Sequence, residues 1–196
     1  MDYTKSKEAA ILEWLKKNLT DQRFSHSIGC AECAVELAKK FNLDEKKAYV
    51  AGLLHDCAKC FSKDEMLDII KKHIPDIDKN ELINHKTLHA PVSAYVAKTE
   101  FGVEDEDILS AIRWHTLGKI EMNDFEKIIF LADKIEPNTR DLEYRGKILK
   151  YLMQKNGLNK ALLTCYKETI KSLVKRDLKI CQVTIDIYNR LLGRCG

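Results

Sequence analysis

The sequence contains few of the residues that interrupt helices, and it carries little net charge. Only 8 glycines and 3 prolines occur among its 196 residues, which favours long helices over a loop-rich or low-complexity chain. No apolar run approaches the roughly 18 residues that a membrane span requires, and the N-terminal segment is amphipathic and charged, unlike a secretory signal. The net charge of +3 gives no basis for nucleic-acid or membrane binding. We therefore expect a cytoplasmic globular protein.

The seven cysteines cannot all pair within one chain, so we expect reduced thiols. Two CxxC pairs, Cys30/Cys33 and Cys57/Cys60, have a spacing found in zinc and redox sites. Cys30 and Cys33 fall inside a long helical segment, however, and no predicted strand precedes either pair, as a thioredoxin-type site would require. Free cysteine commonly packs as a small buried hydrophobe. The context therefore favours packing residues over a thiolate metal site.

The hydrophobic residues recur with the period of a helix, and no alternating pattern typical of strands occurs. Segment 22–41 has two apolar stripes, which is typical of a central helix. Ser62 and Glu65 have the spacing of a capping box. The expected helices are 22–41, Asp44 to about His55, Ser62 to Lys72, one after Pro91 towards Phe101, then about 105–115, 125–135, 147–155, 158–174 and 177–192. We predict an all-α fold with a single domain over 1–196.

The dipeptide His55-Asp56 is weak evidence alone, but it has companions of the same chemistry. Each companion lies on or at the end of an expected helix, beside apolar residues: His26, His89, His115 and Asp133. A carboxylate on a core-facing helix is unfavourable unless it is paired or bound to metal. Imidazoles and carboxylates around one cation satisfy each other. A hydrogen-bonded core histidine is the simpler account of any single one, whereas the whole set favours a metal site.

Five segments carry these residues: RFSHSIGCAECA at 23–34, AGLLHDCAK at 51–59, LHAPVSA at 88–94, ILSAIRWHTLG at 108–118 and IIFLADKIEPNTR at 128–140. Their order resembles the HD-domain metal-dependent phosphohydrolases, and more narrowly the YqeK-type branch of bacterial symmetrical diadenosine tetraphosphate hydrolases. Ala90 and Ser93 stand where we expect glycines in that branch, and EPNTR has one residue more before Arg140 than the expected EPNR. The resemblance covers most of 22–140, and it implies an HD-domain helical bundle.

The resemblance also implies the roles of the site residues. The metal ligands would be His26, His55, Asp56 and Asp133, with iron expected first, manganese as the alternative, and one or two ions per site. Such an ion lowers the pKa of water from about 16 to about 7, and Asp56 would orient the nucleophile. His89 and His115 would either bind a second ion or contact phosphate, and we favour phosphate contact. The other expected substrate contacts are Arg23, Lys59, Thr116, Lys134 and Arg140.

The expected reaction is hydrolysis of diadenosine tetraphosphate to two ADP, so the ligand is a dinucleoside polyphosphate or a nucleoside diphosphate. One alternative is an HD phosphohydrolase acting on a nucleotide monoester or guanosine tetraphosphate, and another is a non-catalytic nucleotide-binding regulator. Because all the candidate ligands are present, we favour the enzyme. As the functional histidine of this region we favour His89 over His85 and His73. The basic stretch 167–179 is interpreted as a solvated helix face. The oligomeric state stays open, a homodimer included.

Overall fold

The computed structural model describes residues 5–82, 84–154 and 156–195, and within them it contains helices and no strand. The elements are α1 Lys5–Asn18, α2 Asp21–Phe41, α3 Glu45–Leu54, the short 3-10 helix η1 Cys57–Cys60, α4 Lys63–His73, α5 Lys79–Leu82, α6 His89–Thr99, α7 Glu106–Trp114, α8 Asp124–Ile135, α9 Leu142–Leu152, α10 Gly157–Lys175 and α11 Gln182–Cys195. The all-α prediction is confirmed.

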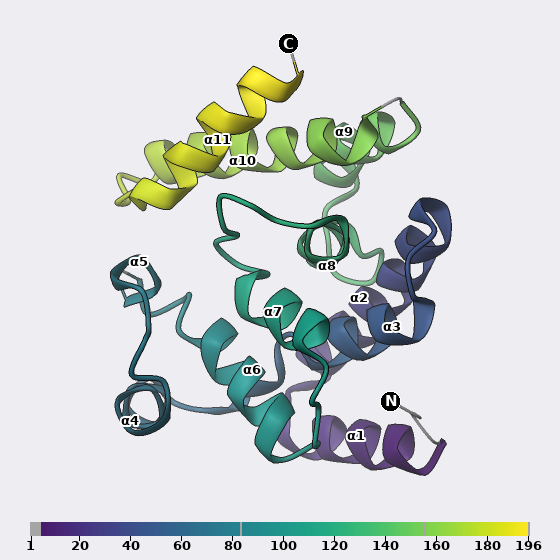
Figure 1. The fold of residues 1–196 in the computed structure, drawn as a ribbon, viewed down its shortest axis with the longest axis vertical. Coiled ribbons are helices and arrows are strands. Elements are labelled where there is room, and N and C mark those ends of the chain that lie inside the picture. The colour runs from purple at the N-terminus through teal and green to yellow at the C-terminus, as the bar shows by residue number, and fades with distance from the viewer. Residues whose placement is uncertain (1–4, 83, 155, 196) are drawn as a thin grey trace.

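Helix α8 lies in the middle of the molecule and is seen end-on in Figure 1. Helices α2 and α3 lie on one side of it, α7 and α6 lie on the other, and α9 to α11 form a layer above it (Figure 1). α8 packs against α2, α7 and α10. Its side chains at Ile128, Ile129 and Leu131 are completely buried, as expected for a helix enclosed by neighbours. Side chains on the face of α8 that these helices leave uncovered are therefore carried by an element that is packed on several sides.

The packing of α3 against α2 depends on a glycine. A Cβ atom at Gly52 would lie 2.7 Å from the Cα of Ala31, so no larger residue fits between the two backbones. Asp44 starts α3 by accepting a hydrogen bond from the backbone N–H of Lys47 at 3.0 Å. This close approach brings the end of α3, with His55, next to the first half of α2.

Most predicted helices agree with the structure, and the differences have physical causes. α6 begins at His89 rather than after Pro91, because proline is tolerated in the first turn, where its missing N–H has no helical partner. α9 begins at Leu142, five residues before the predicted start, because Asp141 caps it through the N–H of Tyr144 at 2.8 Å. α11 starts at Gln182, later than predicted. α1 and the short elements η1 and α5 were not predicted.

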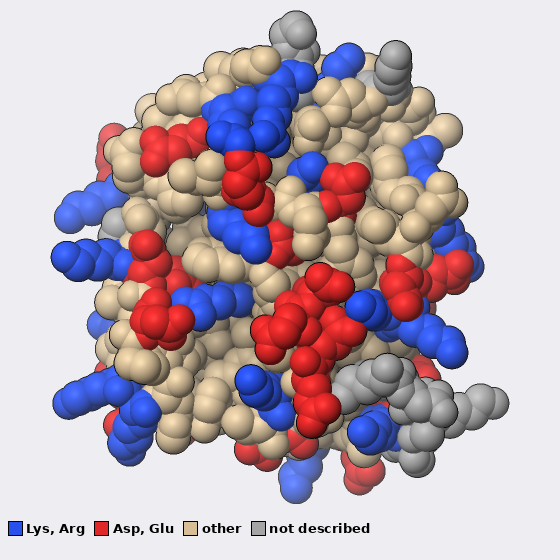
Figure 2. Space-filling view, viewed as in Figure 1, with Lys and Arg blue, Asp and Glu red and all other residues tan. Residues whose placement is uncertain are grey.

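Charged side chains of both signs are distributed over the face of the molecule shown in Figure 2, with an acidic group near its centre. This face therefore presents no continuous basic surface of the kind that binds nucleic acid. Among the residues that the structure describes, no helix is long and apolar enough to cross a membrane.

Candidate metal centre and active site

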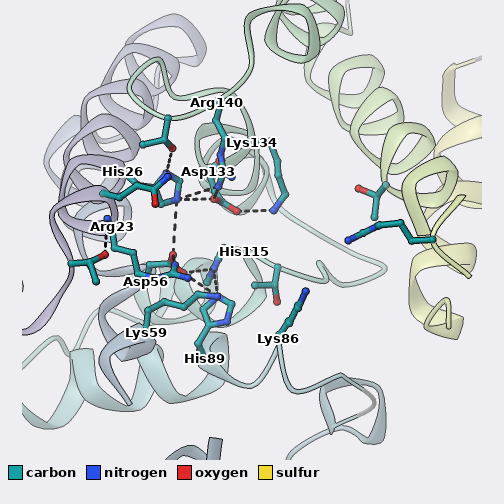
Figure 3. Close-up of a pocket in the computed structure, with 16 residues that line it drawn as sticks. Arg23, His26, Asp56, Lys59, Lys86, His89, His115, Asp133, Lys134 and Arg140 are labelled. Atoms are coloured by element: carbon teal, nitrogen blue, oxygen red, sulfur yellow. Dashed lines mark hydrogen bonds and ion pairs between the residues drawn. The ribbon is translucent and has the colours of Figure 1, made fainter. Parts of the chain in front are cut away.

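The structure brings the sequence-predicted ligands together from five parts of the chain (Figure 3). All are buried, and each lies on a helix or directly after one: His26 in α2, His55 and Asp56 after α3, His89 at the start of α6, His115 after α7, and Asp133 in α8. All of them except the fully buried His55 line a cavity of about 570 Å³, a size typical of small-molecule sites.

The first group of ligand atoms surrounds the Nε2 atoms of His26 and His55, which lie 3.2 Å apart. Asp133 Oδ1 lies 3.0 Å from Nε2 of His26 and 3.8 Å from Nε2 of His55. Asp56 Oδ2 lies 4.0 and 3.9 Å from the same two nitrogens. His26, His55 and Asp56 are close enough to hold one ion, and Asp133 adds a carboxylate oxygen at the same point.

The second group lies on the other oxygen of the same carboxylate. Asp56 Oδ1 is 3.0 Å from His89 Nε2 and 3.5 Å from His115 Nε2, and these two nitrogens are 3.1 Å apart. These three residues are also close enough to hold one ion. Because its two oxygens face different groups, Asp56 is placed to bridge two ions.

The outer nitrogens of three imidazoles fix which atom faces the cluster. His55 Nδ1 donates to the carbonyl of Gly52 at 2.6 Å, and His115 Nδ1 donates to the carbonyl of Ile112 at 2.7 Å. His26 Nδ1 lies 3.0 Å from Oε1 of Glu136. A carbonyl or ionised carboxylate oxygen can only accept, so Nδ1 carries the hydrogen in each ring and Nε2 is the atom that faces the cluster.

This arrangement requires positive charge at the centre. The lone pair of His55 Nε2 points towards His26 Nε2, and the carboxylate of Asp133 lies beside both. Arg140, whose Nη2 lies 3.2 Å from His26 Nε2, and Lys134 meet part of this need, and a bound cation would meet the rest. Metal-ligating histidines usually donate their other N–H in this way, so the donor set fits a divalent cation.

The protonation states also suit metal binding. Burial lowers the pKa of His55 to about 3 and that of His89 to about 4, which keeps both imidazoles neutral at pH 7. Burial alone raises the pKa of Asp56, but His55, His115 and His89 outweigh it and hold that pKa well below its ordinary value. Asp133 is likewise held ionised, by Lys134, His26 and Arg140 against burial.

The predicted phosphate-binding residues line the same cavity: Arg23, Lys59, Thr116, Lys134 and Arg140. Three of these cations contact the ligand carboxylates. Arg23 lies 3.4 Å from Asp56, and Lys134 and Arg140 lie 2.6 and 2.5 Å from Asp133. Burial lowers the pKa of Lys59. Arg140 thus reaches the site despite the extra residue in EPNTR.

The cysteines and the other histidines lie apart from this centre. Among the described residues, no cysteine belongs to a group that could hold an ion. Cys30, Cys33 and Cys57 are buried, and Cys57 donates to the carbonyl of Ser93 at 3.6 Å. His73, the last residue of α4, stacks on Tyr95, and His85 is exposed outside the cavity.

Sequence reasoning missed several residues of the site. Glu136, which is completely buried, orients His26 and also accepts the N–H of Thr139 at 3.1 Å. The sequence feature that could have identified Glu136 is its position three residues after Asp133, within a segment rich in charged residues. The other missed residues are cavity-lining: Thr20, Gln22, Lys86, Thr139, Thr169 and Arg176.

A family model described as "HD domain" matches residues 23–138, which include every ligand of the two groups. The chain belongs to the HD domain family. Two similar proteins named "Bis(5'-nucleosyl)-tetraphosphatase, symmetrical" are each 40% identical to it. The one from Halalkalibacterium halodurans aligns over 92% of this chain and 95% of its own length, and the one from Bacillus subtilis over 93% and 96%.

A solved structure supports the same assignment of the HD domain. It is described as a predicted HD superfamily hydrolase involved in NAD metabolism, from Clostridium acetobutylicum. It matches with a TM-score of 0.88 and 35% identity, covering 95% of this chain and 97% of its own. The similarity therefore extends beyond the HD match and includes α9 to α11.

Proposed function

We propose that this protein is a metal-dependent hydrolase that cleaves diadenosine tetraphosphate symmetrically into two ADP molecules. The observation that carries the proposal is the pair of His/Asp groups sharing Asp56 on the floor of a cavity lined by cations. The relatives from Halalkalibacterium halodurans and Bacillus subtilis, matched over nearly the whole chain, are named for this reaction. The ligand is accordingly a nucleotide with a polyphosphate chain.

The proposed first ion is held by His26, His55, Asp56 and Asp133, and a second by Asp56, His89 and His115. The mixed nitrogen and oxygen donors suit iron or manganese better than a soft thiolate metal. Bound ions of this kind supply water that is activated at neutral pH and neutralise charge on phosphoryl oxygens. Of the two roles that the sequence left open for His89 and His115, we now favour binding of a second ion over phosphate contact. Their Nε2 atoms converge with Asp56 Oδ1, whereas Oδ2 faces His26 and His55.

The cationic side chains have a separate task, which is to position and neutralise the tetraphosphate. Arg23, Lys59 and Lys86 line the cavity near Asp56 and His89, while Lys134 and Arg140 lie near Asp133 (Figure 3). In the reaction, the oxygen of water bonds to one of the two central phosphorus atoms. The bond from that phosphorus to the central bridging oxygen breaks, so that one ADP carries the oxygen of water and the other carries the bridging oxygen. Both protons of the water are released when the two ADP products are fully ionised. Fixed cations aimed at the phosphates stabilise the charge that develops on the leaving oxygen.

Product analysis tests this proposal directly. The purified protein is incubated with diadenosine tetraphosphate and Fe(II) or Mn(II), with and without chelator, and the products are separated by ion exchange. ADP as the only product, lost on chelation and in Asp56→Asn, is the expected result. AMP plus ATP would contradict symmetrical cleavage. Absence of turnover with either metal would favour another HD substrate, such as a nucleotide monoester or guanosine tetraphosphate, or a non-catalytic nucleotide binder.

A further inference from the structure

A second cavity, beside α10, adjoins the cavity that contains the proposed metal ligands. This second space has a volume of about 610 Å³, and we call it the α10 chamber. It is lined by Lys134, Thr139, Arg140, Asp141, Tyr144, Glu168, Thr169, Ser172 and Arg176. Five of these residues also line the first cavity: Lys134, Thr139, Arg140, Thr169 and Arg176. The two spaces therefore adjoin, and the proposed metal ligands that line a cavity line only the first.

The cations of the combined space differ in how far they are neutralised. Lys134 and Arg140 both form ion pairs with Asp133, so their positive charge is partly neutralised. Among the described residues, no carboxylate lies within salt-bridge distance of Lys59, Lys86 or Arg176. These are therefore the cations most available to a polyphosphate.

The available cations lie in different parts of the space. Figure 3 shows Lys59 and Lys86 on the same side of the cluster as His89, away from Lys134 and Arg140. Arg176 follows the last residue of α10 and lines both spaces, at the boundary that it shares with Lys134 and Arg140. Its Nε donates to the carbonyl of Ser172 at 3.1 Å, which restrains the side chain and leaves the other guanidinium nitrogens available.

The substrate of the proposed reaction has matching requirements. A symmetrical tetraphosphate carries one nucleoside diphosphate on each side of the bridge that is cleaved, so both halves need space and positive charge. Of the two carboxylates that line the α10 chamber, Glu168 already pairs with Lys147 and Lys171. Asp141 accepts the N–H of Tyr144 through one oxygen, and its second oxygen is a suitable acceptor for a ribose hydroxyl. The half-buried ring of Tyr144 provides apolar surface for a base.

We propose that the α10 chamber binds one nucleoside diphosphate half of the substrate, with Arg176 and Thr169 contacting its phosphates. This rests on the proposed function and deepens it, because it assigns a substrate-binding role to the C-terminal helices. The other half lies on the side of Lys59 and Lys86. The chamber thereby selects a substrate that carries a nucleoside at both ends.

The test counts ADP molecules bound to the metal-loaded full chain by isothermal titration calorimetry. The wild-type chain binds two ADP, one in each half of the site. Arg176→Ala weakens one of the two sites by roughly 10- to 100-fold, the effect of losing a hydrogen bond to a charged group. It also raises KM for diadenosine tetraphosphate. Thr169→Val, which removes only the hydroxyl group, has the same effect to a smaller degree.

Lys175→Ala is the matched control, because Lys175 is an exposed cation on the same helix that lines neither space. It should retain two ADP sites and the wild-type KM. One ADP per wild-type chain, or two sites unchanged in Arg176→Ala, would overturn the proposal even if symmetrical cleavage is observed. Conversely, two sites that depend on Arg176 in a chain without turnover would uphold the chamber and contradict the proposed function.

Discussion

At the scale of single residues, the decisive feature of the site is the hydrogen-bond partner that Nδ1 has in three of its four imidazoles. His55 and His115 donate to backbone carbonyls of their own helices, which form wherever those helices form. His26 differs, because its partner is a side chain that lies 110 residues away in sequence. Its orientation, and hence the position of its inner nitrogen, therefore depends on Glu136.

Replacing Glu136 by glutamine tests this dependence. The substitution preserves shape and an acceptor oxygen but removes the charge that makes His26 a stronger metal ligand. We expect metal affinity to fall by about 10- to 100-fold, with the helical circular dichroism spectrum unchanged. Competition with a metal-sensitive dye measures the affinity, and added metal should restore the activity.

Glu126→Gln provides the control for Glu136. Glu126 is an equally buried glutamate at the start of the same helix, where it caps the backbone N–H of Asn123 at 3.0 Å. Its substitution should lower stability while leaving metal affinity as in the wild type. An equal loss of affinity in both variants would show that Glu136 acts only through the stability of α8.

The cluster of histidines and aspartates was predictable from sequence because these residues are rare on core-facing stripes, whereas Glu136 was not singled out. A glutamate next to Pro137 at the end of a helix is unremarkable until folding brings His26 against it. Arg176 was hidden for a similar reason, since a basic stretch on a helix is usually solvated. The contribution of a surface cation to a site depends on tertiary packing, which periodicity does not encode.

At the scale of the helices, local signals determined how much could be predicted. The capping box of α4 and the apolar stripes of α2 and α8 gave correct elements because their cause lies within a few residues. The predicted start of α9 was wrong because the residues before 147, PNTRDLEYRG at 137–146, are mostly polar and show no apolar stripe. The cap at Asp141 is a local signal that outweighs this polar pattern.

The N-terminal cap of α3 allows a prediction at this scale, because it stabilises the helix that ends directly before His55-Asp56. Asp44→Ala should lower the free energy of unfolding by about 1 kcal/mol, the usual contribution of such a cap. Asp44→Asn, which keeps the acceptor, should be close to the wild type. Urea denaturation measures all three proteins. Asp68→Ala removes an exposed acid from the middle of α4 and should change stability by less; an equal loss there would contradict the capping account.

At the scale of the whole molecule, the metal centre joins elements that have no other reason to converge. Its ligands come from α2, α6 and α8 and from the residues that follow α3 and α7, so one buried cluster connects most of the layers. Arg23, Lys134 and Arg140 offset the charge of the two carboxylates, but the converging imidazole nitrogens have no donor of their own. Metal binding should therefore stabilise the entire fold, since the ligands converge only in the native state.

Metal removal gives the corresponding measurement. At free metal about 100 times the Kd, binding contributes about 2.7 kcal/mol, which corresponds to a rise in Tm of roughly 5 to 10 °C for a domain of this size.

Elemental analysis of the loaded wild type should give two ions per chain, and His89→Ala should retain one. The double variant Cys57→Ser with Cys60→Ser should keep both ions and the full rise in Tm, because its thiols lie outside both ligand groups. A metal-free double variant would instead place the ion on the CxxC pair, and two ions in His89→Ala would remove this histidine from the second site.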